Sequence, residues 1–145
     1  MKTVLQRVSE AKVKVDGEVV GAIGTGLLVL FCAEPDDDQE KASYFARKIA
    51  SMRIFEDNAG KMNLSVSDIG GAVLAVSQFT LAAEWRKGNR PGFSRAADPQ
   101  TGEAMYNFFC AELRSHGLVV ETGRFGAAME VTLINAGPVT IIMDD

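Results

Sequence analysis

Hydrophobic and polar residues alternate near the start of the chain, and this alternation predicts strands there. Val13 and Val15 alternate with Lys12, Lys14 and Asp16, so every second side chain is apolar, as on a strand with one buried face. The Asp16-Gly17 pair that follows favours a tight hairpin turn, because both residue types tolerate a positive φ. Leu27–Ala33 is a continuous apolar run of strand length, which indicates a strand buried on both faces.

Two later segments have the spacing of amphipathic helices. The first begins at an N-cap that we assign to Asp36, and its apolar positions continue to about Met52. The second begins at Asp98, with Pro99 at its first position, and ends at Gly117. The Asp36 cap lies in a run of three aspartates, which we interpret as a helix start and not as a metal site.

The remaining segments are strands and one long loop. Ala72–Leu81 is predicted to be a second buried strand, and residues 82–97 form a loop long enough to indicate a function. Strand patterns return at Val119 and fill most of the remaining chain. This order predicts a single domain over residues 1–145 with an α/β (α+β) fold, in which a β-barrel-like sheet packs with two helices.

Composition narrows the range of chemistry. With 145 residues, 47% hydrophobic and 23% charged, the chain is typical of a globular domain. His116 is the only histidine and follows a helix, so a histidine triad or a zinc site is disfavoured, and no metal or cofactor is expected. Cys32 and Cys110 are isolated, and no apolar run is long enough to cross a membrane. We therefore expect a reduced, cytoplasmic protein.

The long loop concentrates positive charge. Residues 85–95 hold four cations and no acid, which leaves −8 on the rest of a chain whose net charge is −4. Arg86, Lys87 and Arg90 lie beside aromatic residues, a combination that suits phosphate contact and base stacking. The alternative is a charged loop that only faces solvent.

Two further features are candidates for chemistry. Ser77 and Gln78 begin a polar stretch at the end of the second buried strand, where active-site groups are common, although these residues could simply face solvent. Gly137-Pro138 interrupts the last strand pattern and indicates a bulge, a plain turn or a cis peptide. Arg7 lies among apolar residues and either extends to solvent or binds carbonyls or a phosphate.

Several spaced blocks of the sequence together carry a family resemblance. These blocks are Leu5-Gln6-Arg7-Val8, Arg53-Ile54-Phe55, Gly60-Lys61-Met62-Asn63, Ser77-Gln78-Phe79-Thr80-Leu81, Gly88-Asn89-Arg90-Pro91, Thr122-Gly123-Arg124-Phe125-Gly126-Ala127 with Met129, and Asn135-Ala136-Gly137-Pro138-Val139-Thr140. In them the sequence resembles the D-aminoacyl-tRNA deacylase family. Position 136 is Ala and position 92 is Gly, where Asp and Ser are common in that family; neither change removes an evident chemical group.

The resemblance implies a homodimer with active sites at the interface and an aminoacylated tRNA 3′ end as substrate. It implies that Gly137-Pro138 is cis, enters the partner's site and rejects L-aminoacyl groups, while glycyl-tRNA, such as glycine mischarged on tRNA(Ala), is also hydrolysed. Arg7 would brace this motif. The resemblance assigns reaction-site groups to Ser77, Gln78, Phe79 and Thr80, and substrate contacts to Phe125 and Met129. It also gives the loop cations Arg86, Lys87 and Arg90 a rationale, as phosphate contacts on the tRNA acceptor end.

An aminoacyl ester is reactive, so orientation and oxyanion stabilisation by backbone N–H groups suffice, with the RNA 2′-hydroxyl assisting. A Thr80 nucleophile is the alternative, and it lacks an evident base in sequence. Two further hypotheses stay open: a related deacylase with a trans Gly-Pro bond that accepts a small L-amino acid, and an RNA-binding module without activity.

Overall fold

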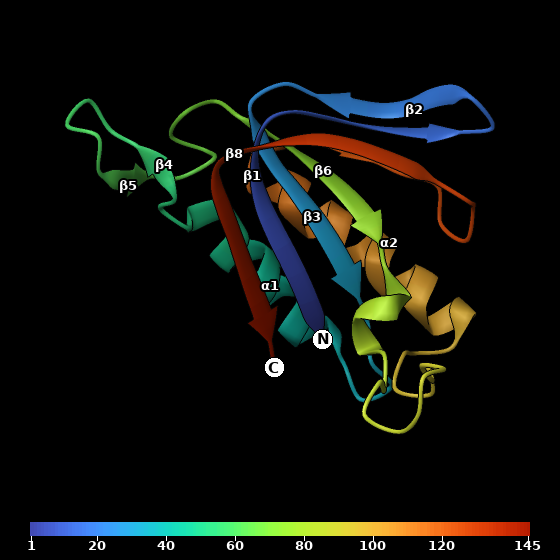
Figure 1. Cartoon of the computed structure of the whole chain (residues 1–145). Coiled ribbons are helices and arrows are strands. Elements are labelled where there is room, and N and C mark those ends of the chain that lie inside the picture. Colours follow the sequence, from blue (N-terminus) through green and yellow to red (C-terminus); the bar gives the residue numbers. More distant parts are fainter.

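The computed structural model describes residues 1–145. One strand, β1 (Lys2–Val15), organises the main sheet, and Figure 1 shows its neighbours on both sides. The other strands of this sheet are β2 (Glu18–Ile23), β3 (Gly26–Cys32), β6 (Ala72–Ser77), β7 (Val119–Thr122) and β8 (Glu130–Asp144).

β1 is long enough to pair with three strands. Its first half pairs with β3, its second half with β2, and β8 runs antiparallel along nearly all of it. β3, β6 and β7 continue the sheet in parallel, and β2 lies against β6 and β7. Since twisted strands curl the sheet, the result is a nearly closed barrel, as predicted.

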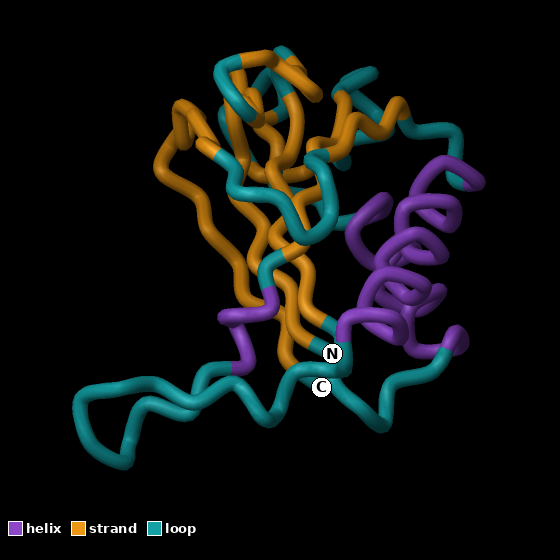
Figure 2. The backbone as a smooth tube through the Cα atoms, turned by 90° about the vertical axis from the view of Figure 1, so that its right-hand side faces the viewer, coloured by secondary structure: helices purple, strands orange, loops and turns teal.

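Two helices, α1 (Gln39–Ser51) and α2 (Pro99–Ser115), cover one side of the sheet, as Figure 2 shows. Their apolar stripes meet the sheet in a core whose largest fully buried side chains include Phe31, Phe45 and Phe109. A smaller apolar group that includes Val8, Val13 and Leu74 is packed between the strands. No helix is both long and apolar enough to cross a membrane.

Several local predictions are confirmed. Asp16 and Gly17 have φ values of 50° and 79°, so both adopt the positive φ that the hairpin turn requires. Asp98 caps α2 by accepting hydrogen bonds from the backbone N–H groups of Gln100 and Thr101, and Pro99 is its first residue. His116 is an exposed residue at the end of α2.

Two local predictions are corrected. The N-cap of α1 is Asp38 and not Asp36, because the Asp38 side chain accepts from the Lys41 backbone N–H. The second buried strand ends at Ser77, since the chain then turns into a 3-10 helix, η1 (Phe79–Ala82). The structure also contains a small hairpin that the sequence pattern did not predict, β4 (Phe55–Glu56) with β5 (Met62–Leu64).

Candidate active site

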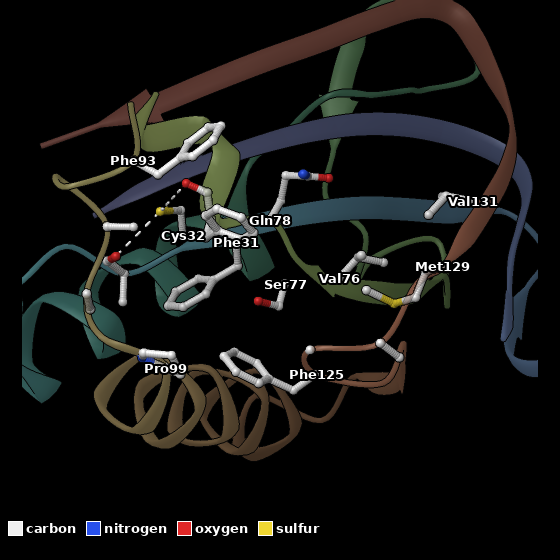
Figure 3. A pocket seen from close by; sticks show the side chains of 17 residues that line it. Phe31, Cys32, Val76, Ser77, Gln78, Phe93, Pro99, Phe125, Met129 and Val131 are labelled. Carbon is white, nitrogen blue, oxygen red and sulfur yellow. Dashed lines mark hydrogen bonds between the residues drawn. The ribbon is translucent and has the colours of Figure 1, made fainter. Parts of the chain in front are cut away.

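A cavity of about 510 Å³ opens where β3 and β6 end, and Figure 3 shows the side chains around it. Twelve of its 17 lining residues are hydrophobic, and its size lies within the range of small-molecule sites. The lining residues are Phe31, Cys32, Ala33, Val76, Ser77, Gln78, Phe79, Phe93, Ala96, Ala97, Pro99, Gly102, Phe125, Gly126, Ala127, Met129 and Val131.

The parallel pairing of β3 and β6 determines where the polar residues of this cavity lie. Phe31 is in register with Ser77, so both strands reach the cavity at the same level. The Gln78 backbone N–H still donates to the Phe31 carbonyl oxygen at 2.7 Å, after which the ladder stops. The end of the ladder frees the next backbone groups from strand pairing, and they turn into η1.

The start of η1 offers unpaired backbone donors. The backbone N–H groups of Phe79 and Thr80 have no acceptor in the chain, because the first N–H groups of a helix lack an intrahelical partner. The Ser77 hydroxyl also makes no hydrogen bond within the chain, and its residue lines the cavity. Two adjacent N–H donors beside a free hydroxyl are suited to bind an oxygen that gains negative charge.

Thr80 itself is poorly placed for nucleophilic attack. It is exposed and does not line the cavity, and its Oγ1 accepts a hydrogen bond from the Gln78 side-chain amide. An amide N–H donates and cannot remove a proton, so Gln78 is no base. His116 lies at the far end of α2, whose N-terminal turn touches the cavity, and 17 helical residues span roughly 25 Å.

The aromatic wall of the cavity rests on the core. The ring of Phe125 lies 6.0 Å from that of Tyr106, and Phe31 stacks on Phe109 at 4.6 Å. The Tyr106 hydroxyl donates to the Ala75 carbonyl oxygen at 2.8 Å, and burial raises the pKa of this hydroxyl, which stays protonated. These contacts fix Phe125 relative to the end of β6.

Cys32 lines the cavity but is not arranged as a nucleophile. Its buried Sγ lies 3.5 Å from the Phe79 carbonyl oxygen, to which it donates (Figure 3). Burial, with Glu34 nearby, raises the pKa of this thiol to about 11, so it remains protonated at neutral pH. Burial likewise raises the pKa of the Cys110 thiol to about 11.

The Gly-Pro pair lies on β8, opposite Arg7. The Gly137–Pro138 peptide bond is cis, and Gly137 has a φ of 126°. The Arg7 guanidinium donates to the carbonyl oxygens of Ala136 at 2.9 Å and Ile54 at 2.8 Å. The backbone conformation at position 137 favours glycine, and a Cβ there would lie 2.6 Å from an Arg7 nitrogen and displace the guanidinium.

The structure does not bring this motif to the chain's own cavity. Gly137 and Pro138 are exposed and line no part of it. Thr3 pairs with Phe31 at the cavity, whereas Arg7 is four residues further along β1, a distance of roughly 13 Å. Within one chain, the cavity and the Gly-Pro pair are therefore separate features.

The basic loop is anchored at its base and exposed at its tip. Glu84 and Gly92 exchange backbone hydrogen bonds at 2.8 and 3.0 Å, and the ring of Phe93 meets that of Phe79 at 5.2 Å. Trp85 is 67% exposed, with the Arg86 guanidinium 5.0 Å from its ring centre. Lys87 and Arg90 are also exposed, and none of these cations lines the cavity.

Of the residues suggested by the sequence, the cavity gathers Ser77, Gln78, Phe79, Phe125 and Met129. The sequence analysis did not identify two parts of the cavity lining, Cys32 and the wall formed by residues 96–102. For Cys32, the only signal in the sequence is its position at the end of an apolar strand. No group of three or more His, Cys, Asp or Glu side chains is arranged to hold a metal ion.

Comparison with known proteins agrees with the sequence motifs. The family model described as D-Tyr-tRNA(Tyr) deacylase matches residues 4–144. Proteins named D-aminoacyl-tRNA deacylase from Ruegeria pomeroyi and Anaeromyxobacter dehalogenans are 62% and 58% identical over 144 residues; the alignment covers 99% of this chain in both cases, and 99% and 97% of those proteins.

Two solved structures share the fold over nearly the whole chain. One, titled c-Myc DNA Unwinding Element Binding Protein, is 42% identical with a TM-score of 0.93 and covers 100% of this chain and 99% of its own. Another, titled as a probable eukaryotic D-amino acid tRNA deacylase, is 19% identical with a TM-score of 0.84, covering 99% and 98%. The chain belongs to the D-Tyr-tRNA(Tyr) deacylase family.

Proposed function

We propose that this protein hydrolyses the ester bond of D-aminoacyl-tRNA and releases a free D-amino acid and tRNA. The observation that carries the proposal is full-length similarity to proteins named for this activity, combined with a cavity lined by Phe79 at the start of η1, where the N–H groups of Phe79 and the next residue, Thr80, are unpaired. A tRNA substrate is consistent with a reaction in the cytoplasm.

The proposed chemistry relies on the backbone. Water attacks the ester carbonyl carbon, and the N–H groups of Phe79 and Thr80 stabilise the oxyanion that forms. The bond to the ribose 3′-oxygen then breaks, and that oxygen takes up the proton that the attacking water loses, which the neighbouring 2′-hydroxyl of the RNA relays. Ser77 and Gln78 orient the ester from the end of β6. This scheme needs no side-chain base.

A Thr80 nucleophile is less consistent with the geometry. The hydroxyl is exposed, and its hydrogen-bond partner is an amide donor and not a base. Replacing Thr80 with Val tests the point, because the backbone N–H remains while the hydroxyl is lost. Near-normal hydrolysis of D-Tyr-tRNA by this variant supports the backbone mechanism, and complete loss of activity supports the nucleophile.

Chiral selection is assigned to Gly137 and Pro138, supported by Arg7. Their carbonyl oxygens would occupy the space of an L-side chain and leave a D-side chain free to point outward. Glycine has no side chain to exclude, so glycyl-tRNA, including glycine mischarged on tRNA(Ala), is also proposed as a substrate. The motif lies opposite Arg7, roughly 13 Å along β1 from the residue that pairs with Phe31 at the cavity of the same chain. It would therefore act in the site of a partner chain.

A homodimer follows from that requirement. The outer edge of β8 pairs with no strand, and its exposed apolar residues include Ile134 and Ile142, which are 53% and 72% exposed. Apolar side chains along a free strand edge are suited to burial against a second copy. Sedimentation at micromolar concentration should give twice the 15.6 kDa chain mass, and a monomer that remains active would contradict shared sites.

Contact with the tRNA acceptor end is assigned to the basic loop, with Phe125 and Met129 holding the terminal adenosine in the cavity. Replacing Arg86, Lys87 and Arg90 together with Ala should weaken binding and reduce the slope of log affinity against log salt by about 2 to 3. Binding that is insensitive to salt in the unmodified protein would contradict this assignment.

The decisive experiment compares hydrolysis of D-Tyr-tRNA, L-Tyr-tRNA and a small L-aminoacyl-tRNA such as L-Ala-tRNA by the purified protein. Hydrolysis of the D-ester alone supports the proposal. Preference for the small L-ester would favour a related L-specific deacylase. Binding of tRNA without hydrolysis of any ester would favour an RNA-binding module, whose binding of tRNA would depend on the basic loop alone.

A further inference from the structure

The Gly-Pro pair lies in a short loop that leaves the ladder between β1 and β8. Gln6 pairs with Thr140 and Val8 pairs with Asn135, so Arg7 alone stands opposite four residues of β8. These four residues, 136–139, make no ladder pair with β1, so their backbone joins the sheet at the two ends of the loop. The position of the Gly-Pro carbonyl groups therefore depends on what closes those ends.

The Asn135 side chain bridges the two ends. Its Oδ1 accepts a hydrogen bond from the Val139 backbone N–H at 3.2 Å, and its Nδ2 donates to Thr140 Oγ1 at 3.1 Å. A backbone N–H can only donate, so the Val139 bond fixes the orientation of the amide. One side chain on the entering strand is thus bound to both residues where the loop returns.

A third residue, Gln6 on β1, also binds the end of the loop. Gln6 Nε2 donates to the same Thr140 hydroxyl oxygen at 3.3 Å. These bonds lie along the ladder, whereas Arg7 binds the loop through the Ala136 carbonyl oxygen. The loop therefore has two separate restraints, one on its interior and one at its neck.

We propose that Asn135, with Thr140, is a positioning residue for the Gly-Pro motif. It touches no reacting atom; it limits movement of the 136–139 loop, so that the Gly137 and Pro138 carbonyl groups keep the positions that reject an L-side chain. The inference rests on the proposed chiral function of this motif. It adds a specificity determinant outside both the cavity and the Arg7 contact.

The test is the ratio of kcat/KM for D-Tyr-tRNA to that for L-Tyr-tRNA. Asn135→Ala removes two hydrogen bonds and should lower the ratio by about two- to tenfold for each, mainly through faster L-ester hydrolysis. The KM for the D-ester should change little, because the cavity and the basic loop are untouched.

Conservative variants separate the two bonds. Thr140→Val lacks the hydroxyl but leaves the Asn135 bond with the Val139 N–H in place, so it should lower the ratio less than Asn135→Ala does. Thr140→Ser restores the hydroxyl and should restore the ratio. Thr132→Val, an exposed threonine on the same strand, is the matched control and should leave the ratio unchanged.

Amide hydrogen exchange gives a readout that does not depend on activity. The Val139 N–H should exchange faster in Asn135→Ala than in the unmodified protein and in Thr132→Val. Unchanged exchange would overturn the proposed restraint. If Asn135→Ala does not fold, the Thr140→Val and Thr140→Ser pair carries the test.

The outcomes distinguish this inference from the proposed function. An unchanged D-to-L ratio in Asn135→Ala, or an equal loss of activity on both esters, would overturn the positioning role while leaving chiral hydrolysis intact. An unmodified protein that hydrolyses both esters equally would overturn the proposed chiral function itself, and with it the selective role of Asn135. A lower ratio in Asn135→Ala that Thr140→Ser does not share supports the inference.

Discussion

The cavity and the Gly-Pro loop are held in place in different ways. Four segments meet at the cavity: β3, β6 with η1, residues 93–102 and residues 125–131. The aromatic wall of the cavity stacks on the core. The Gly-Pro loop is one short segment, held by hydrogen bonds from Arg7 and Asn135. Burial therefore maintains the binding space, whereas polar contacts maintain the proposed filter. Mutations should be able to damage one without the other.

The largest expected effect is on the core beneath the cavity. Phe109 is fully buried and stacks on Phe31, so Phe109→Ala should lower the free energy of unfolding by about 3–5 kcal/mol. Val119→Ala, at a side chain that is 63% exposed, is the control and should change it by less than about 0.5 kcal/mol. Urea denaturation measures both, and equal effects would contradict a cavity supported by this core.

Arg7→Ala should affect the loop and spare the cavity. It removes two charge-assisted hydrogen bonds, so the D-to-L ratio of kcat/KM should fall by about 10- to 100-fold. Arg7→Lys keeps the charge but lacks the planar fork and should recover only part of the ratio. Steady-state kinetics with both esters give the ratio, and a large rise in KM for the D-ester would show that the two regions are coupled.

Gly102 tests the cavity without touching the loop. A Cβ there would lie 3.6 Å from the Phe125 ring, which is ordinary contact, so Gly102→Ala should keep activity and slightly stabilise α2. Gly102→Leu places a larger side chain against Phe125 and should raise KM by about tenfold, a cost of about 1.4 kcal/mol. The D-to-L ratio should not change. A changed ratio would mean that the cavity also selects chirality.

The smallest expected effect is a change in how the melting temperature depends on pH under acidic conditions. Hydrogen bonds from Thr101 and from the Gln100 backbone N–H hold the pKa of Asp98 below its usual value of 3.8. This carboxylate therefore stabilises the start of α2 at pH values above 3.8, and the contribution is lost as pH falls through the lowered pKa. Asp98→Asn still caps the helix but does not titrate, so its melting temperature should fall less between about pH 4 and pH 2. Identical acid profiles would contradict this contribution.

Local features of the fold could be predicted from the sequence because they depend on neighbouring residues. The Asp16-Gly17 turn, the Asp98 cap and the strand at Leu27–Ala33 were correctly predicted in this way. The cap of α1 was misassigned because three successive aspartates compete for it. Which of them binds the Lys41 N–H depends on the others: Asp37 instead contacts the Glu34 backbone N–H and the N-terminal ammonium.

The candidate site also has features that depend on residue identity alone and features that depend on the fold. The family motifs and the basic loop could be recognised in the sequence, because they follow from residue identity. The fold was needed to show that Ser77 and Phe125 share a cavity, that the N–H groups of Phe79 and Thr80 lack acceptors, and that Asn135 closes the Gly-Pro loop. Such relations arise when long-range strand pairing and core packing bring distant segments together, and no local pattern records them.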